Sequence, residues 1–169
     1  VHDAACPPSA EARYRSLAGA GRLPVSVLVM PHAEGLLAPL DPSRLAGPPT
    51  GDGDEMLRVG PVKLFADGGT LPAIDGHVHG HPVRMGHVFP GVDAEVARVV
   101  DRGFRVAVHA IGNRGIEVAL DAFTETAHRR PDDDHRFRIE HASLVGPDQI
   151  RRMVALGVVG VVQPGFVHH

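Results

Sequence analysis

The sequence predicts an α/β fold built on a parallel sheet, and three features support this. Aliphatic runs such as 23–30, 62–66 and 104–110 are typical of strands covered on both faces. Segments with helical periodicity alternate with these runs, and Gly or Pro residues end most segments. Such alternation favours parallel strands joined by right-handed crossovers. Both an open doubly wound sheet and part of a (β/α)8 barrel fit this order.

The N-terminal part is expected to hold one helix, one strand and a long surface excursion. Residues 1–8 are small and contain proline, which favours an irregular start. Apolar residues at helical spacing predict a helix over 9–18, followed by the strand 23–30. Residues 33–58 are rich in Pro and Gly, so they predict an excursion with a short helix near 43–45.

The C-terminal part repeats strand and helix more regularly. Residues 70–91 contain His77, His79, His81 and His87 and are expected to form a loop. The elements predicted after that loop are a helix over 92–102, a strand over 104–110, a helix capped by Asn113, a strand over 136–142, a helix starting at Gly146-Pro147 and a last strand over 158–163.

Composition and charge exclude several classes of protein. A chain of 169 residues can bury one sizeable core. A net charge of −3 and a pI near 6.5 give no electrostatic footprint for nucleic acid or an anionic membrane. No apolar run approaches the ~18 residues of a membrane span. The single cysteine, Cys6, excludes an internal disulfide and suits a reducing compartment, so a cytoplasmic location is expected.

Lys63 is the most informative single residue. It is the only lysine among the 17 Lys and Arg residues, and it lies in an apolar run. Burying an ammonium costs several kcal/mol unless it is paired, neutralised or used chemically. A lysine that snorkels or pairs with a carboxylate is the simpler alternative. However, two later strands end in His109 and His141, and three apolar strands ending in Lys, His and His predict a metal site.

The chemistry of these side chains suits a divalent metal. Neutral imidazole is the commonest protein ligand of Zn²⁺, and a buried lysine in its free amine form can capture CO₂ as a bidentate carbamate. Strand alternation is expected to place His141 on one face with Phe137 and Ile139. Arg138 and Glu140 would then face the other way and need an ion pair.

Four sequence blocks resemble the amidohydrolase superfamily, most closely the amidohydrolase 3 family. They read Val-Lys-Leu-Phe-Ala-Asp-Gly, Val-Ala-Val-His-Ala-Ile-Gly-Asn, Arg-Ile-Glu-His-Ala and Gly-Val-Val-Gly-Val-Val-Gln-Pro. The likeness runs from about Ser9 to the C-terminus. It implies a metal-dependent hydrolase of non-peptide C–N bonds on a (β/α)8 TIM-type barrel, of which this chain would form about strands 3 to 7. It also implies Lys63 as a bridging, carboxylated lysine, with His109 and His141 as ligands of the second metal, and zinc as the expected ion.

The chain departs from the family pattern in several places. The family's strand-1 His-x-His pair and strand-8 aspartate are not found, Asn113 replaces a usual Asp, and the histidine cluster is unusual. Residues 1–169 are therefore expected to be a partial catalytic barrel, cut at both ends and inactive alone. The 74–79 segment resembles the strand-1 metal motif but follows the lysine strand. It is expected to lie over the active-site mouth.

The resulting expectations can be stated by residue. Lys63, His109 and His141 are the expected metal ligands. Asp67, His77 and His79 are the expected substrate-binding residues, and His32 is a weaker candidate for the site. The partner is a small-molecule substrate, with neither nucleic acid nor membrane. The alternatives are a non-catalytic binding or interaction module that retains the amidohydrolase core, and a metal-binding protein built on the histidine-rich loop.

Overall fold

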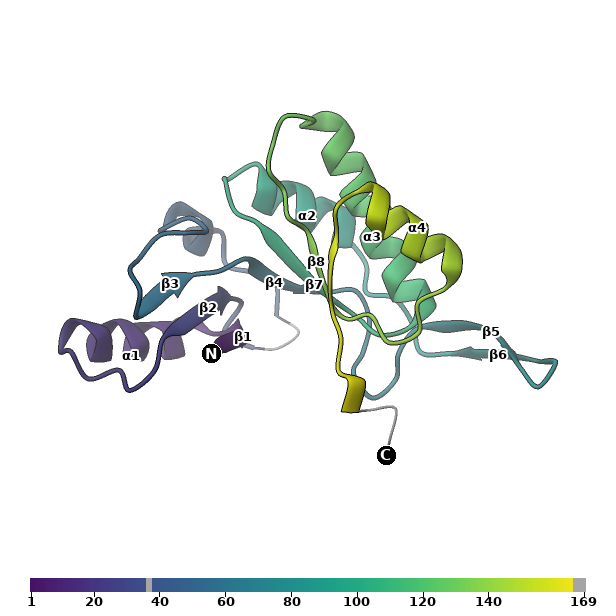
Figure 1. The fold of residues 1–169 in the computed structure, drawn as a ribbon, viewed down its shortest axis with the longest axis horizontal. Coiled ribbons are helices and arrows are strands. Elements are labelled where there is room, and N and C mark those ends of the chain that lie inside the picture. The colour runs from purple at the N-terminus through teal and green to yellow at the C-terminus, as the bar shows by residue number, and fades with distance from the viewer. Residues whose placement is uncertain (36–37, 166–169) are drawn as a thin grey trace. The chain divides into compact units, whose positions relative to one another are not determined.

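The computed structural model describes residues 1–35 and 38–165 (Figure 1). The chain divides into two compact units. The first comprises Val1–Lys63 with Arg98–Val106, and the second comprises Leu64–Ala97 with Ala107–His169. Both units contain parallel strands flanked by helices, which makes the chain an α/β protein. Among the described residues, no helix is long and apolar enough to cross a membrane.

The first unit is built on a three-stranded sheet of order β1-β2-β3, in which both pairs are parallel. Its elements are β1 (His2–Cys6), α1 (Pro8–Gly19), β2 (Val27–Pro31), the short 3-10 helix η1 (Pro42–Ala46) and β3 (Leu57–Val59). The predicted helix, strand and short helix are therefore present. The expectation of an irregular start is wrong, because His2 and Asp3 pair with Leu28 and Val29 of β2.

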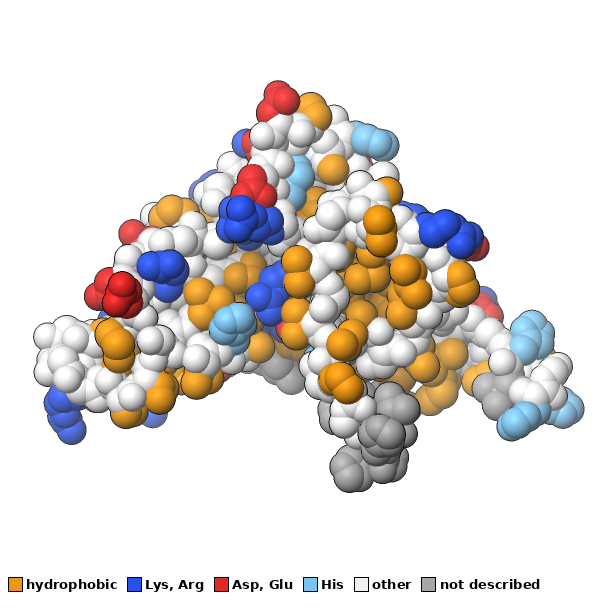
Figure 2. Space-filling view, viewed as in Figure 1, with side chains coloured by type: hydrophobic (Ala, Val, Ile, Leu, Met, Phe, Trp, Pro, Cys, Tyr) orange, Lys and Arg blue, Asp and Glu red, His pale blue; other side chains and the backbone are white. Residues whose placement is uncertain are grey.

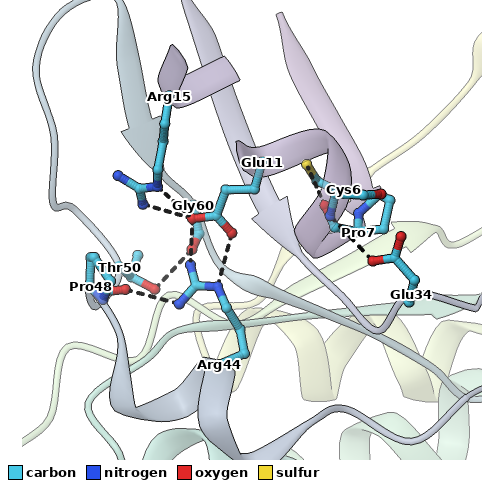
Figure 3. A network of polar contacts seen from close by, with 10 residues as sticks. Cys6, Pro7, Glu11, Arg15, Glu34, Arg44, Pro48, Thr50 and Gly60 are labelled. Carbon is cyan, nitrogen blue, oxygen red and sulfur yellow. Dashed lines mark hydrogen bonds and ion pairs between the residues drawn. The ribbon is translucent and has the colours of Figure 1, made fainter. Parts of the chain in front are cut away.

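A buried carboxylate joins α1 to η1 in this unit (Figure 3). Glu11 is 6% exposed and accepts from the guanidinium of Arg15 at 2.7 Å and from that of Arg44 at 3.0 Å. The Arg44 guanidinium also lies 5.5 Å above the ring centroid of Phe104. Two cations offset the desolvation of one carboxylate here, so the contact fixes η1 without leaving an unpaired charge. Nearby, burial raises the pKa of the Cys6 thiol to about 12, which keeps this thiol protonated at neutral pH.

The second unit carries most of a four-stranded sheet of order β4-β7-β8-β9. These strands are β4 (Val62–Phe65), β7 (Val106–Ala110), β8 (Arg138–His141) and β9 (Val159–Val161). The pairs β7–β8 and β8–β9 are parallel, and all five positions of β7 are buried. The accompanying helices are α2 (Val92–Val100), α3 (Asn113–Arg129) and α4 (Pro147–Ala155). The predicted elements are present, mostly with shorter bounds.

The core of this unit forms between α3 and the sheet. Phe123 of α3 stacks on Phe137 with ring centroids 4.3 Å apart. Ile116, Leu120 and Ile139 are fully buried. Burial of such side chains contributes about 1.5–3 kcal/mol each, so this packing fixes the sheet that carries His109 and His141.

The histidine-rich segment is a hairpin, so the prediction of a loop is wrong. Strands β5 (Ile74–Val78) and β6 (His81–Met85) pair antiparallel. The two connecting residues, His79 and Gly80, have φ of +50° and +80°. Positive φ at both central positions is typical of a type I′ turn, which suits the twist of two antiparallel strands.

The base of the hairpin is tied to the start of α3 by one side chain. Asn113 accepts from the backbone N–H of Asp75 at 3.0 Å and donates through Nδ2 to the carbonyl of Asp75 at 2.7 Å. Asn113 was predicted to cap α3, but the N-cap residue is Gly112, and the Asn113 amide pairs with the hairpin instead. Asn113 therefore joins the histidine-rich hairpin to the start of α3.

Apolar side chains remain exposed over α4 and β9 (Figure 2). Ile150 and Val154 of α4 are 48% and 77% exposed, and Val159 of β9 is 47% exposed. These residues form the apolar face predicted for α4 and part of the last strand. Within the described chain they lack the cover that the corresponding residues of α3 have.

Candidate metal centre

His109 lies at the C-terminal end of β7 and is 6% exposed. Its ring centroid is 5.1 Å from that of Phe65 and 4.6 Å from that of His141, with the two imidazoles nearly edge to face at 70°. The expected proximity of the two histidines is therefore confirmed. Two imidazoles at this separation, at the C-terminal ends of parallel strands, fit the positions in which α/β proteins bind ligands.

The approach of His141 depends on an unusual backbone conformation. The β7–β8 register pairs Val108 with Ile139 and His109 with Glu140. Paired residues share a face, so regular alternation would put His141 on the face of Ile139, opposite His109. His141 instead has φ of +80°, in the left-handed region. The prediction that His141 simply shares a face with Phe137 and Ile139 is thus wrong, because the alternation breaks at His141.

Left-handed φ at two consecutive non-glycine residues marks this corner as strained. Ala142, which follows His141, has φ of +44°. Such a conformation costs about 1–2 kcal/mol for a residue with a Cβ. Strain of this kind concentrates at functional sites, where surrounding structure maintains it.

Gln163 holds the His141 ring in place. The Nδ1 atom of His141 lies 2.8 Å from Oε1 of Gln163. An amide oxygen only accepts, so Nδ1 carries the proton and Nε2 keeps its lone pair. Ligand histidines commonly donate their second ring N–H to an oxygen in this way. Sequence reasoning missed Gln163, although its place at the end of a predicted strand was a usable signal.

Asp67 is completely buried beside His109. Its oxygens accept from the backbone N–H groups of Ala73 at 3.0 Å, Ile111 at 3.0 Å and Gly112 at 2.7 Å. Its Oδ1 atom is 3.6 Å from Nε2 of His109. The carboxylate therefore joins three segments around one imidazole, and its expected contact with substrate stays a prediction.

Lys63 and His32 lie in the first unit, where both are buried. Nδ1 of His32 is 2.8 Å from the carbonyl oxygen of Lys63, so this nitrogen donates to it. Lys63 is 3% exposed on β4, which agrees with the expectation of a buried lysine. The distance between Lys63 and the two histidines of the other unit stays a prediction.

The hairpin histidines are exposed and gather at its far end (Figure 2). His77 lies in β5 and His79 in the turn, and their expected contact with substrate also stays a prediction. Across residues 1–35 and 38–165, no three His, Cys, Asp or Glu side chains are grouped closely enough to hold a metal ion. The described geometry therefore brings His109 and His141 together as a candidate ligand pair, and it does not support a metal site built on the hairpin alone.

The ion pair expected for Arg138 and Glu140 is formed by these two residues themselves. Nε of Arg138 lies 2.9 Å from Oε1 of Glu140, which is 7% exposed. The opposite charges of this pair cancel one another in the residues directly before His141. It leaves the two imidazoles without a strong local charge from β8.

Comparisons with known proteins identify relatives of this chain. The sequence profile of the amidohydrolase family matches residues 2–169. An N-substituted formamide deformylase of Arthrobacter pascens is 34% identical over 115 residues, which cover 66% of this chain and 21% of that protein.

Two solved structures share the fold along nearly the whole chain. They are uncharacterized metal-dependent hydrolases from Pyrococcus furiosus and Pyrococcus horikoshii OT3. Their TM-scores are 0.77 and 0.78, with 29% and 28% sequence identity. Each match covers 99% of this chain but only 35% and 33% of the respective hydrolase, so the chain spans about a third of their length.

Proposed function

Because this chain belongs to the amidohydrolase family, we propose that it supplies part of the active site of a metal-dependent hydrolase. The reaction is cleavage of a non-peptide, amide-type C–N bond in a small molecule. The observation that carries this proposal is the His109–His141 pair, with ring centroids 4.6 Å apart and a left-handed backbone at His141. The family match supplies the reaction class.

The residues take separate roles in this proposal. His141 offers Nε2 to a divalent metal, proposed to be zinc, while Gln163 holds its Nδ1–H. His109 is the second imidazole ligand, and Lys63 contributes as a carbamate. When bound, a divalent ion here supplies a Lewis acid for the substrate carbonyl and an acidified water. His77 and His79 remain the proposed substrate-binding residues, and a different role is proposed for Asp67 below.

The proposed protein is larger than the chain. Residues 1–169 would form part of a TIM-type barrel, with β2, β4, β7, β8 and β9 corresponding to strands 3 to 7. A His-x-His pair on strand 1 and an aspartate on strand 8 would complete the ligand set. The share of the relatives that this chain covers, from 21% to 35%, supports a partial barrel. Alone, the chain is expected to be inactive, and its location is proposed to be cytoplasmic.

A second candidate function is a non-catalytic binding module that retains the amidohydrolase core. The observation that favours it is the absence of a three-residue His, Cys, Asp or Glu group among the described residues. The two candidates differ in what Lys63 must do. In a binding module, Lys63 needs only to be a buried cation, alone or paired with a carboxylate. In the hydrolase, its side-chain amine must be able to react with CO₂.

Replacing Lys63 by Arg in the full-length protein tests the proposal. Arginine stays protonated, so it can neither take up CO₂ nor act as a ligand. We expect loss of hydrolysis and a lower zinc content, with the fold retained. Activity would be measured on a panel that starts with N-substituted formamides, and zinc by elemental analysis.

The matched control is Arg58→Lys, the reverse exchange at an exposed position of β3. It should keep both activity and zinc. Wild-type zinc and rate in Lys63→Arg would contradict the hydrolase proposal and favour the binding module.

A further inference from the structure

Both carboxylate oxygens of Asp67 accept hydrogen bonds from backbone groups of this chain. Three backbone N–H groups, from Ala73, Ile111 and Gly112, donate to its two oxygens, and none of its surface is exposed. An ionised carboxylate only accepts, so three donors match its chemistry. A substrate could reach this carboxylate only by displacing these contacts.

The missing side chain of Gly115 in α3 leaves space for the Asp67 carboxylate. A Cβ added at Gly115 would lie 2.6 Å from Cγ and Oδ2 of Asp67. Real Cβ contacts are not this short, so any larger residue at Gly115 would push the carboxylate away. The position of the Asp67 carboxylate therefore depends on a glycine at position 115.

The remaining neighbour of Asp67 is His109. Oδ1 of Asp67 lies 3.6 Å from Nε2 of the imidazole, within electrostatic reach although longer than a hydrogen bond. The same Oδ1 accepts from the N–H of Ile111, two residues after His109. Asp67 therefore holds the backbone that follows His109 and places a carboxylate beside the buried Nε2 of its ring.

We propose that Asp67 is a positioning residue, which orients His109 for metal binding and does not itself contact the substrate. This inference rests on the proposed function, because it assumes that His109 is a metal ligand. The carboxylate favours the tautomer of His109 whose proton is on Nε2, the nitrogen that faces it. A fixed tautomer leaves one defined nitrogen, Nδ1, with a lone pair.

The direct test is ¹⁵N NMR of the full-length, metal-free protein labelled in the histidine rings. In the wild type, His109 should hold a single tautomer protonated at Nε2. In Asp67→Asn this tautomer should become mixed, whereas His141, which donates to Gln163, should keep its proton on Nδ1. A purely structural role would lower the melting temperature and leave the His109 tautomer unchanged.

Zinc binding gives a second readout by calorimetry. Loss of a residue that orients a ligand typically lowers metal affinity about 10–100-fold, and we expect at least tenfold for Asp67→Asn. Gly115→Ala should give a similar loss, because it displaces the carboxylate without removing its charge. Asp54→Asn is the control, since Asp54 also accepts from two backbone N–H groups, those of Met56 and Leu57, but belongs to the first unit and has no described contact with a histidine.

The outcomes separate this inference from the proposed function. A His109 protonated at Nδ1 in the wild type, or an unchanged tautomer in a folded Asp67→Asn or Gly115→Ala protein, overturns the role of Asp67. If neither variant folds, the tautomer of His109 in the wild-type protein alone decides whether Asp67 has the proposed role. If the wild type binds no zinc at these histidines, the proposed function fails, while the tautomer still tests what Asp67 does.

Discussion

At the scale of single residues, the backbone at His141 links fold stability to the proposed metal site. Its φ of +80°, followed by +44° at Ala142, brings the imidazole beside His109 where a regular strand would direct it away. Left-handed φ costs about 1–2 kcal/mol at each residue with a Cβ. The site is therefore maintained at the expense of fold stability, as is common for functional positions.

Glycine substitutions at these two residues test that coupling. Gly adopts left-handed φ without a steric penalty, but it also raises the entropy of the unfolded chain. We expect Ala142→Gly to raise the free energy of unfolding by about 0.5–1 kcal/mol, measured by denaturant titration, and His141→Gly to raise it less, because that change also removes the contact with Gln163. Only His141→Gly should lose zinc affinity, since Ala142→Gly keeps the imidazole. Destabilisation by both variants would show that the corner is not strained.

At the scale of elements, the side chain of Asn113 joins the hairpin to α3. It forms the pair of backbone hydrogen bonds that a neighbouring strand would form. Asn113 accepts from and donates to the backbone of a single residue, Asp75. A second link forms where the carbonyl of Ala73 accepts from the N–H of Arg114 at 3.0 Å. The amide of Asn113 can do both tasks because it carries a donor and an acceptor.

Asn113→Asp should therefore loosen the hairpin. A carboxylate cannot donate to the Asp75 carbonyl and would repel it, although Asp is the residue that the family pattern usually has here. We expect faster amide hydrogen exchange in β5 and β6, with protection of β7 unchanged. Asp75→Asn serves as control, because it weakens the ion pair with Arg84 but keeps the Asn113 contacts. Equal protection of the hairpin in Asn113→Asp and the wild type would contradict the role of Asn113.

Elements with strong local patterns could be predicted from the sequence, whereas those that depend on distant partners could not. The helices over α3 and α4 follow apolar periodicity, and β7 is a continuous aliphatic run. By contrast, β1 consists mostly of small residues and forms only because β2 lies beside it. For the site, strand ends located the histidine pair, but the left-handed φ at His141 could not be predicted, because histidine is enriched in that region yet adopts it at only a small share of positions.

At the scale of the whole molecule, apolar side chains of α4 and β9 in the second unit remain exposed. Ile150 and Val154 of α4 and Val159 of β9 are each close to half exposed or more. β9 is also the last strand in the described order β4-β7-β8-β9, so one of its edges is unpaired there. Exposed apolar residues beside an open strand edge favour association between chains.

The 169-residue chain alone is accordingly expected to self-associate and to melt without a sharp transition. Sedimentation velocity and calorimetry would measure both properties. Replacing Ile150 and Val154 together by Lys should reduce the association, because charge opposes burial of that face. A monodisperse wild-type monomer with cooperative melting would show instead that residues 1–169 form a complete domain.

The hairpin also has a practical consequence for handling the protein. His77, His79 and His81 are exposed on the hairpin close to its two-residue turn, and His87 is exposed beyond the end of β6, at the base of the hairpin. Neutral imidazoles bind immobilised Ni²⁺ or Co²⁺ through individual weak contacts, without the three-ligand group that a resident ion needs. A chromatography resin charged with such an ion would retain the untagged protein.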